Sequence, residues 1–348
     1  MQRLMMILLV ITVPLSVIGK YMHWSELALF AIACAAIIPL AGIMGRATES
    51  IAIHSGPKIG GLLNATFGNA VELIIAFFAL REGLIGVVQA SITGSIIGNL
   101  LLVSGLSMLV GGIRHPQQKF NRIIAGTNAA MMLLGVVIAL VIPAIFSLSH
   151  PDRIDIKLSI GVSIVVMVLY LLGLFFSLYT HRNLFNYTED MHPEEAEWSV
   201  GKAIGVLALA TVAVAFESEL LVHTIDAVSQ QLGWSEVFIG VIIVAIIGNA
   251  AEHSSAVLMA WRNKMDLALE IAVGSSLQIA MFVTPVLVFL SLLLGNPMSL
   301  VFTWPELAAM VLSVFLINFL AQDGESNWLE GAMALGAYVI IGIGFYFL

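Results

Sequence analysis

Long apolar segments, separated by short polar stretches, follow one another along the whole chain. A helix needs about 20 consecutive apolar residues to cross a bilayer, and most of these segments reach that length. We therefore predict an all-α polytopic membrane protein with eleven transmembrane helices. They cover approximately residues 4–20, 24–45, 59–81, 84–112, 122–148, 156–180, 200–225, 237–261, 267–294, 303–322 and 329–348.

The first apolar segment follows Arg3 and has the length of a secretory signal peptide. No small-residue cleavage motif of the A-x-A type comes after it. We therefore interpret residues 4–20 as a retained membrane helix.

A carboxylate lies in the middle of the third segment, within the motif Gly-Asn-Ala-Val-Glu at residues 68–72. The motif returns 180 residues later as Gly-Asn-Ala-Ala-Glu at residues 248–252, and at this offset ten positions of the two surrounding windows are identical. Apolar composition alone would not pair glycines, asparagines and glutamates in register, so we infer a duplicated unit. An unpaired carboxylate at the bilayer centre costs at least about 2.5–3.5 kcal/mol, which indicates that Glu72 and Glu252 are functional.

The offset of 180 residues divides the chain into four parts. Five predicted helices separate equivalent positions, so the two repeats cross the membrane in opposite directions. Such inverted repeats are typical of transporters, and they would bring Glu72 and Glu252 together near the midplane. The parts are an extra N-terminal helix at 1–22, the first five-helix repeat at 23–180, an acidic linker at 181–199 and the second five-helix repeat at 200–348.

Composition and charge narrow the class further. The chain is 60% hydrophobic with a mean hydropathy of +1.02, as expected of a membrane protein. Its net charge of −8 argues against a nucleic-acid partner, and Cys34, the only cysteine, excludes an intrachain disulfide. Ten of the 14 Lys and Arg residues fall on the side of the N-terminus in the eleven-helix arrangement. We therefore predict a multi-pass protein of the cell membrane with a cytoplasmic N-terminus and an external C-terminus.

The linker at 181–199 is the longest polar stretch, and it carries five acids and two histidines. A solvated connection between the repeats is the simpler interpretation of such a run. Sensing of divalent cations by the acids and histidines is the alternative.

The duplicated motifs carry the ligand types that a hard cation prefers. Asn and Glu three residues apart share one face of a helix, and the preceding glycine lets the backbone open and expose carbonyl oxygens. Ca²⁺ takes six to eight oxygen ligands from carboxylates, amides, backbone carbonyls and water. An alternative role as polar glue between helices suits a single glutamate better than a symmetric pair. The expected cation and proton site consists of Glu72, Glu252, Asn69 and Asn249, with Gly68 and Gly248 opening the backbone.

Polar residues on the fourth and ninth segments are candidates for a second layer around the predicted ion site. Packing is an equal alternative for the small hydroxyl residues, whereas an amide in the middle of the membrane needs partners, which makes Gln278 the stronger candidate. Asn99 lies one position after the counterpart of Gln278 and is a candidate for a related role. The predicted supporting residues are Thr93, Ser95, Ser275, Ser276 and Gln278.

Two further groups have alternatives that the sequence leaves open. His253 has Leu73 as its counterpart, so it breaks the symmetry; it either passes protons beside Glu252 or, as we favour, donates a hydrogen bond as a neutral group. Glu217, Glu219 and His223 on the seventh segment either form a proton or access path, or Glu219 and His223 simply pair at a spacing of four residues.

The paired motifs at 68–72 and 248–253 resemble the two signature repeats of the calcium/proton exchangers, within the wider cation/calcium exchanger superfamily. The resemblance covers nearly the whole chain. It implies that Glu72 and Glu252 are the essential cation and proton ligands, with Asn69, Asn249, Ser275 and Gln278 in support, and that His253 belongs to the second signature. The sodium/calcium exchangers of that superfamily usually carry further acids or hydroxyls in the equivalents of helices four and nine. Their absence here favours protons as the counter-ion.

We accordingly predict an antiporter that exports Ca²⁺ from the cytoplasm in exchange for protons by alternating access, with both ions competing for Glu72 and Glu252. Exchange of another cation, as Na⁺/Ca²⁺ or Mn²⁺/H⁺ exchange, is the alternative, and a passive cation channel is a weaker one. No nucleophile–base pair or His-Glu-x-x-His motif indicates an enzyme. The expected partners are Ca²⁺ as transported substrate, protons and the lipid bilayer, without a cofactor; the oligomeric state stays open, a homo-oligomer included.

Overall fold

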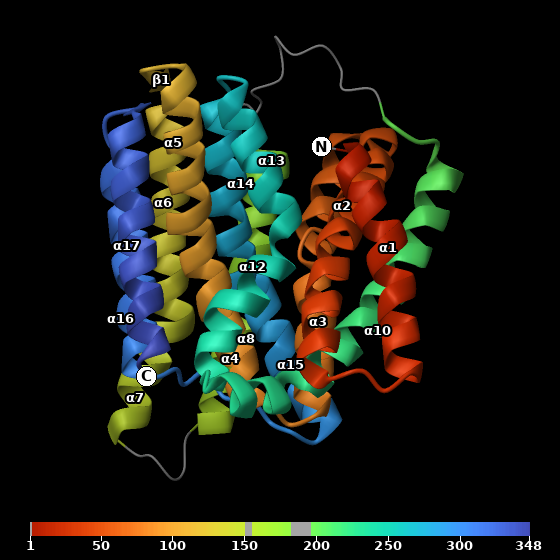
Figure 1. The fold of residues 1–348 in the computed structure, drawn as a ribbon. Helices are drawn as coiled ribbons and strands as arrows, with labels where there is room; N and C mark the ends of the chain where they lie inside the picture. Colours follow the sequence, from red (N-terminus) through yellow and green to blue (C-terminus); the bar gives the residue numbers. More distant parts are fainter. Residues whose placement is uncertain (1, 150–154, 182–195) are drawn as a thin grey trace.

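The computed structural model describes residues 2–149, 155–181 and 196–348, and most of them are helical (Figure 1). The first half contains α1 (Gln2–Tyr21), α2 (Glu26–Phe67), α3 (Ala70–Arg81), α4 (Ile85–Ile97), η1 (Gly98–Val103), α5 (Ser104–Arg114), β1 (Gln118–Lys119), α6 (Arg122–Val136), η2 (Val137–Val141), α7 (Ile142–Ser149), α8 (Asp155–Phe175) and η3 (Phe176–Thr180). The second half contains α10 (Val200–Leu232), α11 (Glu236–Phe238), η5 (Ile239–Val244), α12 (Ala245–Gly248), α13 (Ala250–Trp261), α14 (Met265–Gln278), η6 (Ile279–Val283), α15 (Thr284–Leu294), α16 (Trp304–Leu320), β2 (Glu325–Ser326) and α17 (Trp328–Tyr346).

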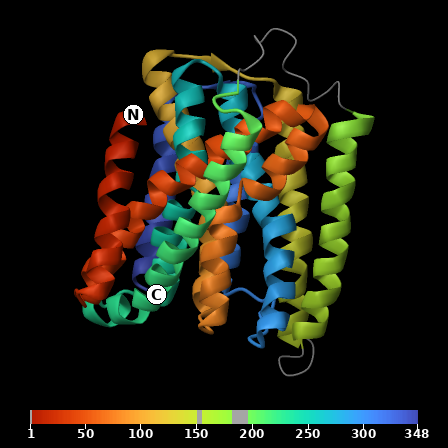
Figure 2. The same cartoon turned by 90° about the vertical axis from the view of Figure 1, so that its right-hand side faces the viewer.

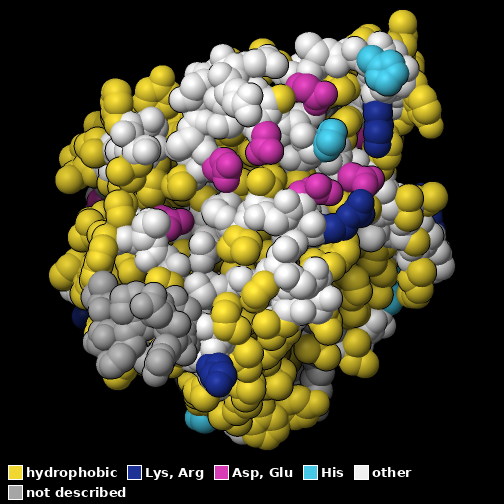
Figure 3. All heavy atoms as spheres, turned by 90° about the horizontal axis from the view of Figure 1, so that it is seen from below, with side chains coloured by type: hydrophobic (Ala, Val, Ile, Leu, Met, Phe, Trp, Pro, Cys, Tyr) yellow, Lys and Arg dark blue, Asp and Glu magenta, His cyan; other side chains and the backbone are white. Residues whose placement is uncertain are grey.

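Most of the long helices run along one common direction, and their connections gather at two ends (Figures 1 and 2). Helix α1 begins at the end that carries β1, whereas α17 ends at the opposite end (Figure 1). Strands β1 and β2 pair antiparallel, with Gln118 opposite Ser326, and so connect two turns at the first end. Acidic side chains gather on the second end (Figure 3), where Glu26, Glu82 and Glu236 lie at helix termini.

The length and apolarity of the helices suit a membrane. Within the described residues, seven helices are long and apolar enough to cross a bilayer, or eight if the bent pair Glu236–Gly248 and Ala250–Trp261 forms one span. Two shorter apolar helices, Met5–Tyr21 and Trp304–Leu320, accompany them. Large apolar side chains such as Leu209 (75% exposed) and Leu293 (83% exposed) cover the outside. The prediction of an all-α polytopic membrane protein is confirmed at this level.

The predicted boundary after the second segment is wrong. Helix α2 continues through the polar residues at 46–55, bends at Gly56 (φ 80°) and runs on to Phe67 without an intervening loop. Residues 46–55 are polar in part but contain no glycine or proline. The apolar run therefore ends there, whereas nothing in the residues stops the helix. The predicted linker 181–199 lies mostly outside the described residues.

Close contact between α4 and η5 joins the two halves of the chain. A methyl group on Gly94 would overlap the backbone carbonyl of Val241, and one on Gly240 would lie 2.6 Å from the Cβ of Ala90. Small residues at such a crossing let two membrane helices approach through their backbones. Gly274, the counterpart of Gly94 at the 180-residue offset, has no atom within 4 Å of a Cβ built on it.

We expect Gly94→Ala to destabilise the protein by about 1–3 kcal/mol, because overpacking forces the backbones of α4 and η5 apart. Gly274→Ala is the matched control and should unfold at the wild-type temperature. Thermal unfolding of the two purified variants in detergent checks this. Equal melting temperatures would show that the contact with Val241 does not limit packing.

Candidate ion-binding site

Two breaks in the helices place the duplicated carboxylates. Asn69 (φ −96°, ψ 23°) lies between α2 and α3, and Asn249 (φ −93°, ψ 13°) lies between α12 and α13, where the axis bends by 61°. Glu72 and Glu252 therefore lie in the first turn of a new helix. Backbone N–H groups at a helix N-terminus lack intrahelical partners, and the helix dipole there favours negative charge.

The structure brings the first carboxylate onto the second motif. A Cβ built on Gly248 would lie 3.1 Å from Cγ of Glu72, so the missing side chain of this glycine makes room for the glutamate. The two carboxyl groups of Glu72 and Glu252 are close enough to interact electrostatically. Both oxygens of Glu72 are buried and have no hydrogen-bond partner among the described residues.

The two asparagines of the motifs belong to one chain of hydrogen bonds. Asn69 Nδ2 donates to Oε1 of Gln278 at 2.7 Å, and its Oδ1 accepts a bond from Ser275 Oγ at 3.4 Å. Asn249 Nδ2 donates to Ser95 Oγ at 2.8 Å. Each asparagine is thus held by a serine of the other half, and the four residues Asn69, Ser275, Asn249 and Ser95 are buried.

Asn99, which the sequence offered as a candidate for a role related to that of Gln278, connects these two groups. Its fully buried Nδ2 donates to Asn249 Oδ1 and to Ser275 Oγ, both at 3.2 Å. Its Oδ1 is buried and has no partner in the described part of the chain. The signal in the sequence was its position, one residue after the counterpart of Gln278.

Wider helical turns follow the serines on both sides. The π-helical turns η1 and η6 lie at nearly equivalent places in the two halves. In each, one carbonyl accepts both the backbone N–H and the hydroxyl of the residue five positions later: Ser104 Oγ donates to Asn99 O at 3.3 Å, and Thr284 Oγ1 donates to Ile279 O at 2.7 Å. Such single-turn bulges are frequent at functional sites.

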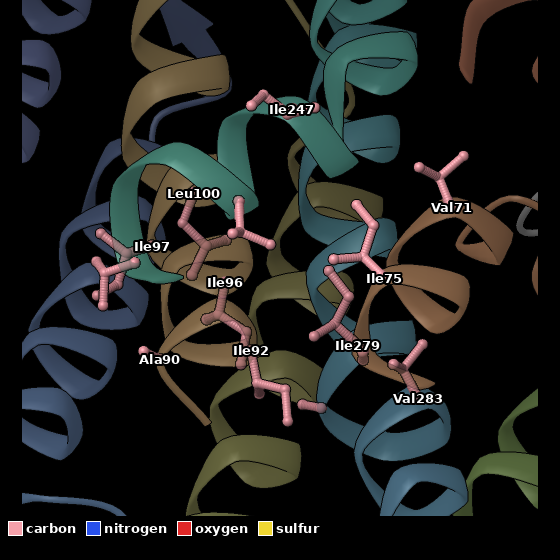
Figure 4. Packing of buried hydrophobic residues seen from close by; sticks show 14 of the residues in the cluster. Val71, Ile75, Ala90, Ile92, Ile96, Ile97, Leu100, Ile247, Ile279 and Val283 are labelled. Atoms are coloured by element: carbon pink, nitrogen blue, oxygen red, sulfur yellow. The ribbon is translucent and has the colours of Figure 1, made fainter. Parts of the chain in front are cut away.

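Apolar side chains surround this polar chain. Figure 4 shows buried residues of α3, α4, η1, α12 and η6 packed around the helix breaks, among them Ile75, Ile96 and Ile279. Water is therefore scarce on this side of the carboxylates, and the electrostatic interactions between them are screened little.

Two predicted supporting residues point elsewhere. Thr93 Oγ1 donates to Oε1 of Glu306 at 3.3 Å, and Ser276 Oγ donates to the carbonyl of Ala272 in its own helix. Glu306 is 2% exposed, and its other oxygen caps the start of α16 through Thr303. It is a buried acid that hydropathy did not reveal, because it lies at the helix end.

The acids of α10 lie apart from the duplicated motifs. Glu217 is buried and accepts a hydrogen bond from Ser16 of α1, while its Oε2 has no partner among the described residues. Glu219 forms an ion pair with Arg81 at 3.4 Å, a partner that neither alternative considered for it had named. His223 is exposed.

His253 lies next to Glu252 and is partly exposed. Its Nε2 is buried without a hydrogen-bond partner in the described residues, and the predicted donor role of the ring stays a prediction.

The two carboxylates of Glu72 and Glu252 are the main ligands that the site offers to a cation. Within the described residues, no group of three or more His, Cys, Asp or Glu side chains is arranged to hold a metal ion. A bound divalent cation would therefore have to complete its shell with amide oxygens, backbone carbonyls at the breaks and water. Such a mixed shell suits an ion that must also leave.

The fold and the buried acidic site define a multi-pass membrane transport protein. The model of the sodium/calcium exchanger protein family matches residues 25–179 and 202–347. The chain belongs to this family.

Close relatives narrow the family membership. The chain is 56% identical to the "Ca(2+)/H(+) antiporter ChaA" of Bacillus subtilis (strain 168), over 100% of both chains. It is 47% identical to a "Ca(2+)/H(+) antiporter" of Aphanothece halophytica, over 97% of this chain and 95% of the relative. The solved structure of native YfkE superimposes with a TM-score of 0.88 at 53% identity, covering 99% of this chain and 100% of that one. The resemblance to calcium/proton exchangers seen in the motifs is confirmed.

We expect Asn99→Leu to weaken Ca²⁺ binding by at least about thirtyfold, because it leaves buried polar groups of Asn249 and Ser275 unpaired at about 1–3 kcal/mol each. Ser276→Ala is the control, since that hydroxyl bonds only within its own helix, and should stay within about threefold of wild type. Calorimetric titration of Ca²⁺ into both variants measures this. Wild-type affinity in folded Asn99→Leu would exclude a role for the amide chain in binding.

Proposed function

We propose that this protein is an antiporter that exports Ca²⁺ from the cytoplasm in exchange for protons. The observation that carries the proposal is the pair of buried, unpartnered oxygens of Glu72, which lie against Gly248 beside the second carboxylate. Acceptor oxygens without a donor suit a cation or a proton as their partner. The names of the relatives support Ca²⁺ and H⁺ as the two ions.

Exclusion between the two ions would supply the coupling. Two ionised carboxylates repel each other strongly where the surroundings are apolar, so an empty site takes up protons. One Ca²⁺ or two protons neutralise Glu72 and Glu252 equally well, but the carboxylates cannot hold both at once. The protein can then change between its inward-open and outward-open states only when the site has bound one ion or the other.

Inverted repeats would supply the alternating access. We propose eleven spans: the candidate helices, the shorter α1 and α16, and a span formed by α3 with the end of α2. An odd number agrees with α1 beginning and α17 ending at opposite ends (Figure 1). The hydrogen bonds between Asn69 and Ser275 and between Asn249 and Ser95 support two equivalent halves, at 23–180 and 200–348.

The distribution of charge supports the orientation. Lys119 and Arg262 lie at the end where α1 begins, whereas the opposite end is rich in acids (Figure 3). The excess of basic residues marks the cytoplasmic side. We therefore propose a cell-membrane protein with its N-terminus inside and its C-terminus outside. Ca²⁺ is its transported substrate, and we assign it neither an enzymatic activity nor a resident cofactor.

We expect a proton gradient directed out of the liposomes, with an acidic interior, to drive Ca²⁺ uphill into proteoliposomes that contain the protein. Glu72→Gln and Glu252→Gln should each abolish this uptake, because the amide can neither release a proton nor balance the charge of Ca²⁺. Glu217→Gln is the control, since Glu217 bonds Ser16 away from the motifs, and should retain transport.

The same liposomes distinguish the alternatives. Uptake driven by a Na⁺ gradient and not by a pH gradient would favour sodium as the counter-ion. Ca²⁺ movement that only equalises concentrations would indicate a channel. Normal pH-driven uptake by Glu72→Gln would overturn the site assignment.

We further expect Ca²⁺ binding to release protons, because both ions use the same carboxylates. Calorimetry in buffers of different ionisation enthalpy counts the protons released per Ca²⁺ bound. At a pH where the empty pair is protonated, the count should approach two. A count near zero at every pH between about 5 and 9, with Ca²⁺ still bound, would contradict the shared site and leave Glu217, Glu219 and His223 as the better proton path.

A further inference from the structure

The helices that carry the two carboxylates end in the same way. The carbonyl of Leu80 accepts the N–H of Gly83 at 3.1 Å, and the carbonyl of Ala260 accepts the N–H of Asn263 at 3.0 Å. Gly83 (φ 78°) and Asn263 (φ 61°) both adopt the left-handed conformation that commonly closes a helix. These positions correspond at the 180-residue offset, so each carboxylate helix stops with one carbonyl turned toward a neighbour.

A carboxamide from the other half of the chain reaches each of these carbonyls. Asn296 Nδ2 donates to Leu80 O at 2.8 Å, and Gln118 Nε2 donates to Ala260 O at 2.8 Å. Asn296 lies in the connection between α15 and α16, and Gln118 lies in the connection between α5 and α6. The two bonds form at opposite ends of the molecule, so each half donates a hydrogen bond to the carboxylate helix of the other half.

Both connections are themselves held firmly. Gln118 is 1% exposed and packs against Gly111, where any side chain would collide with its amide, and it also donates to Asn263 Oδ1 at 3.0 Å. On the other side, Ser291, the counterpart of Gly111, accepts the N–H of Met298 at 2.8 Å.

The segment that carries Asn296 is fixed along its length. Gln89 Nε2 donates to the carbonyls of Ser299 and Val301 at 2.9 and 3.0 Å. The segment also buries Met298 and Leu300. Each carboxamide therefore acts from a rigid support.

We propose that Gln118 and Asn296 are positioning residues, each of which holds the helix of one carboxylate in place from the opposite repeat. Helices α3 and α13 have 12 residues each, and a break separates each from the helix before it. The amide chain around Asn69 and Asn249 holds their first turns. The bonds to Leu80 and Ala260 hold their other ends, so that Glu72 and Glu252 keep a fixed separation. The assignment to ion binding rests on the proposed function.

The two bonds are present together. Both measure 2.8 Å in the same structure, as expected of two permanent supports.

Gln118→Met tests the proposal at one end, because methionine fills a similar volume without a donor. Gln117→Met is the control, since Gln117 is the exposed neighbour. Gln118→Met should weaken Ca²⁺ binding by about five- to a hundredfold, the change that loss of two hydrogen bonds commonly produces. The number of protons released per Ca²⁺ should stay at the wild-type value, because both carboxylates remain. A role in stability alone would lower the melting temperature and leave the affinity of the folded protein unchanged.

A distance measurement makes the outcome independent of the transported ion. Spin labels at Ser255→Cys of α13 and Met333→Cys of α17, both exposed, in a Cys34→Ala background report the position of the carboxylate helix. Gln118→Met should shift or broaden the distance distribution, and Gln117→Met should not. An unchanged distribution in Gln118→Met overturns the proposal.

A shifted distribution in a protein that exchanges no Ca²⁺ would refute the proposed function and leave the positioning role standing. If Gln118→Met does not fold, Asn296→Leu with Pro297→Ala as its control tests the other end by Ca²⁺ affinity. Wild-type affinity in folded Asn296→Leu would then overturn the proposal.

Discussion

Two carboxyl groups that share an apolar interior cannot both stay ionised and empty, and the rest of the structure is arranged around that constraint. Glu72 lies against Gly248, and each glutamate lies in the first turn of a new helix, where free N–H groups and the helix dipole favour its charge. The described residues place no Lys or Arg in a hydrogen bond or ion pair with either carboxylate. Neutralisation therefore has to come from an ion or from protons, which is the property that a coupled exchanger needs.

Breaks in the helices have a cost that the amide chain offsets. Opening the backbone at Asn69 and Asn249 leaves polar groups at membrane depth, where every unsatisfied group is expensive. The side chains of the same asparagines, together with Ser95, Ser275 and Asn99, form hydrogen bonds across the break. One set of residues thus opens the site and holds it together, so these asparagines cannot be exchanged for apolar residues of similar size without loss.

Much of this could be predicted from the sequence, because the signals were local or repeated. Hydropathy indicated the membrane helices, and the register of the repeat placed the two motifs against each other. Contacts between distant residues left no such signal. The ion pair of Glu219 with Arg81 joins positions 138 residues apart, and the bond from Thr93 to Glu306 joins positions 213 residues apart. The helical course of residues 46–55 was missed because helix formation there does not depend on apolar residues.

The duplication preserves contacts more faithfully than residues. At the 180-residue offset Gln118 corresponds to Met298 and not to Asn296. The two carboxamides nevertheless bind corresponding carbonyls, each on the carboxylate helix of the opposite half. An alignment of the two halves would not pair them. The common requirement is a second donor for a carbonyl at the end of a short helix that a break has separated from its predecessor, and any donor on a rigid neighbouring connection can meet it. The two halves are therefore symmetric in how they hold the two carboxylates. Their residues are identical mainly where the backbone itself must break.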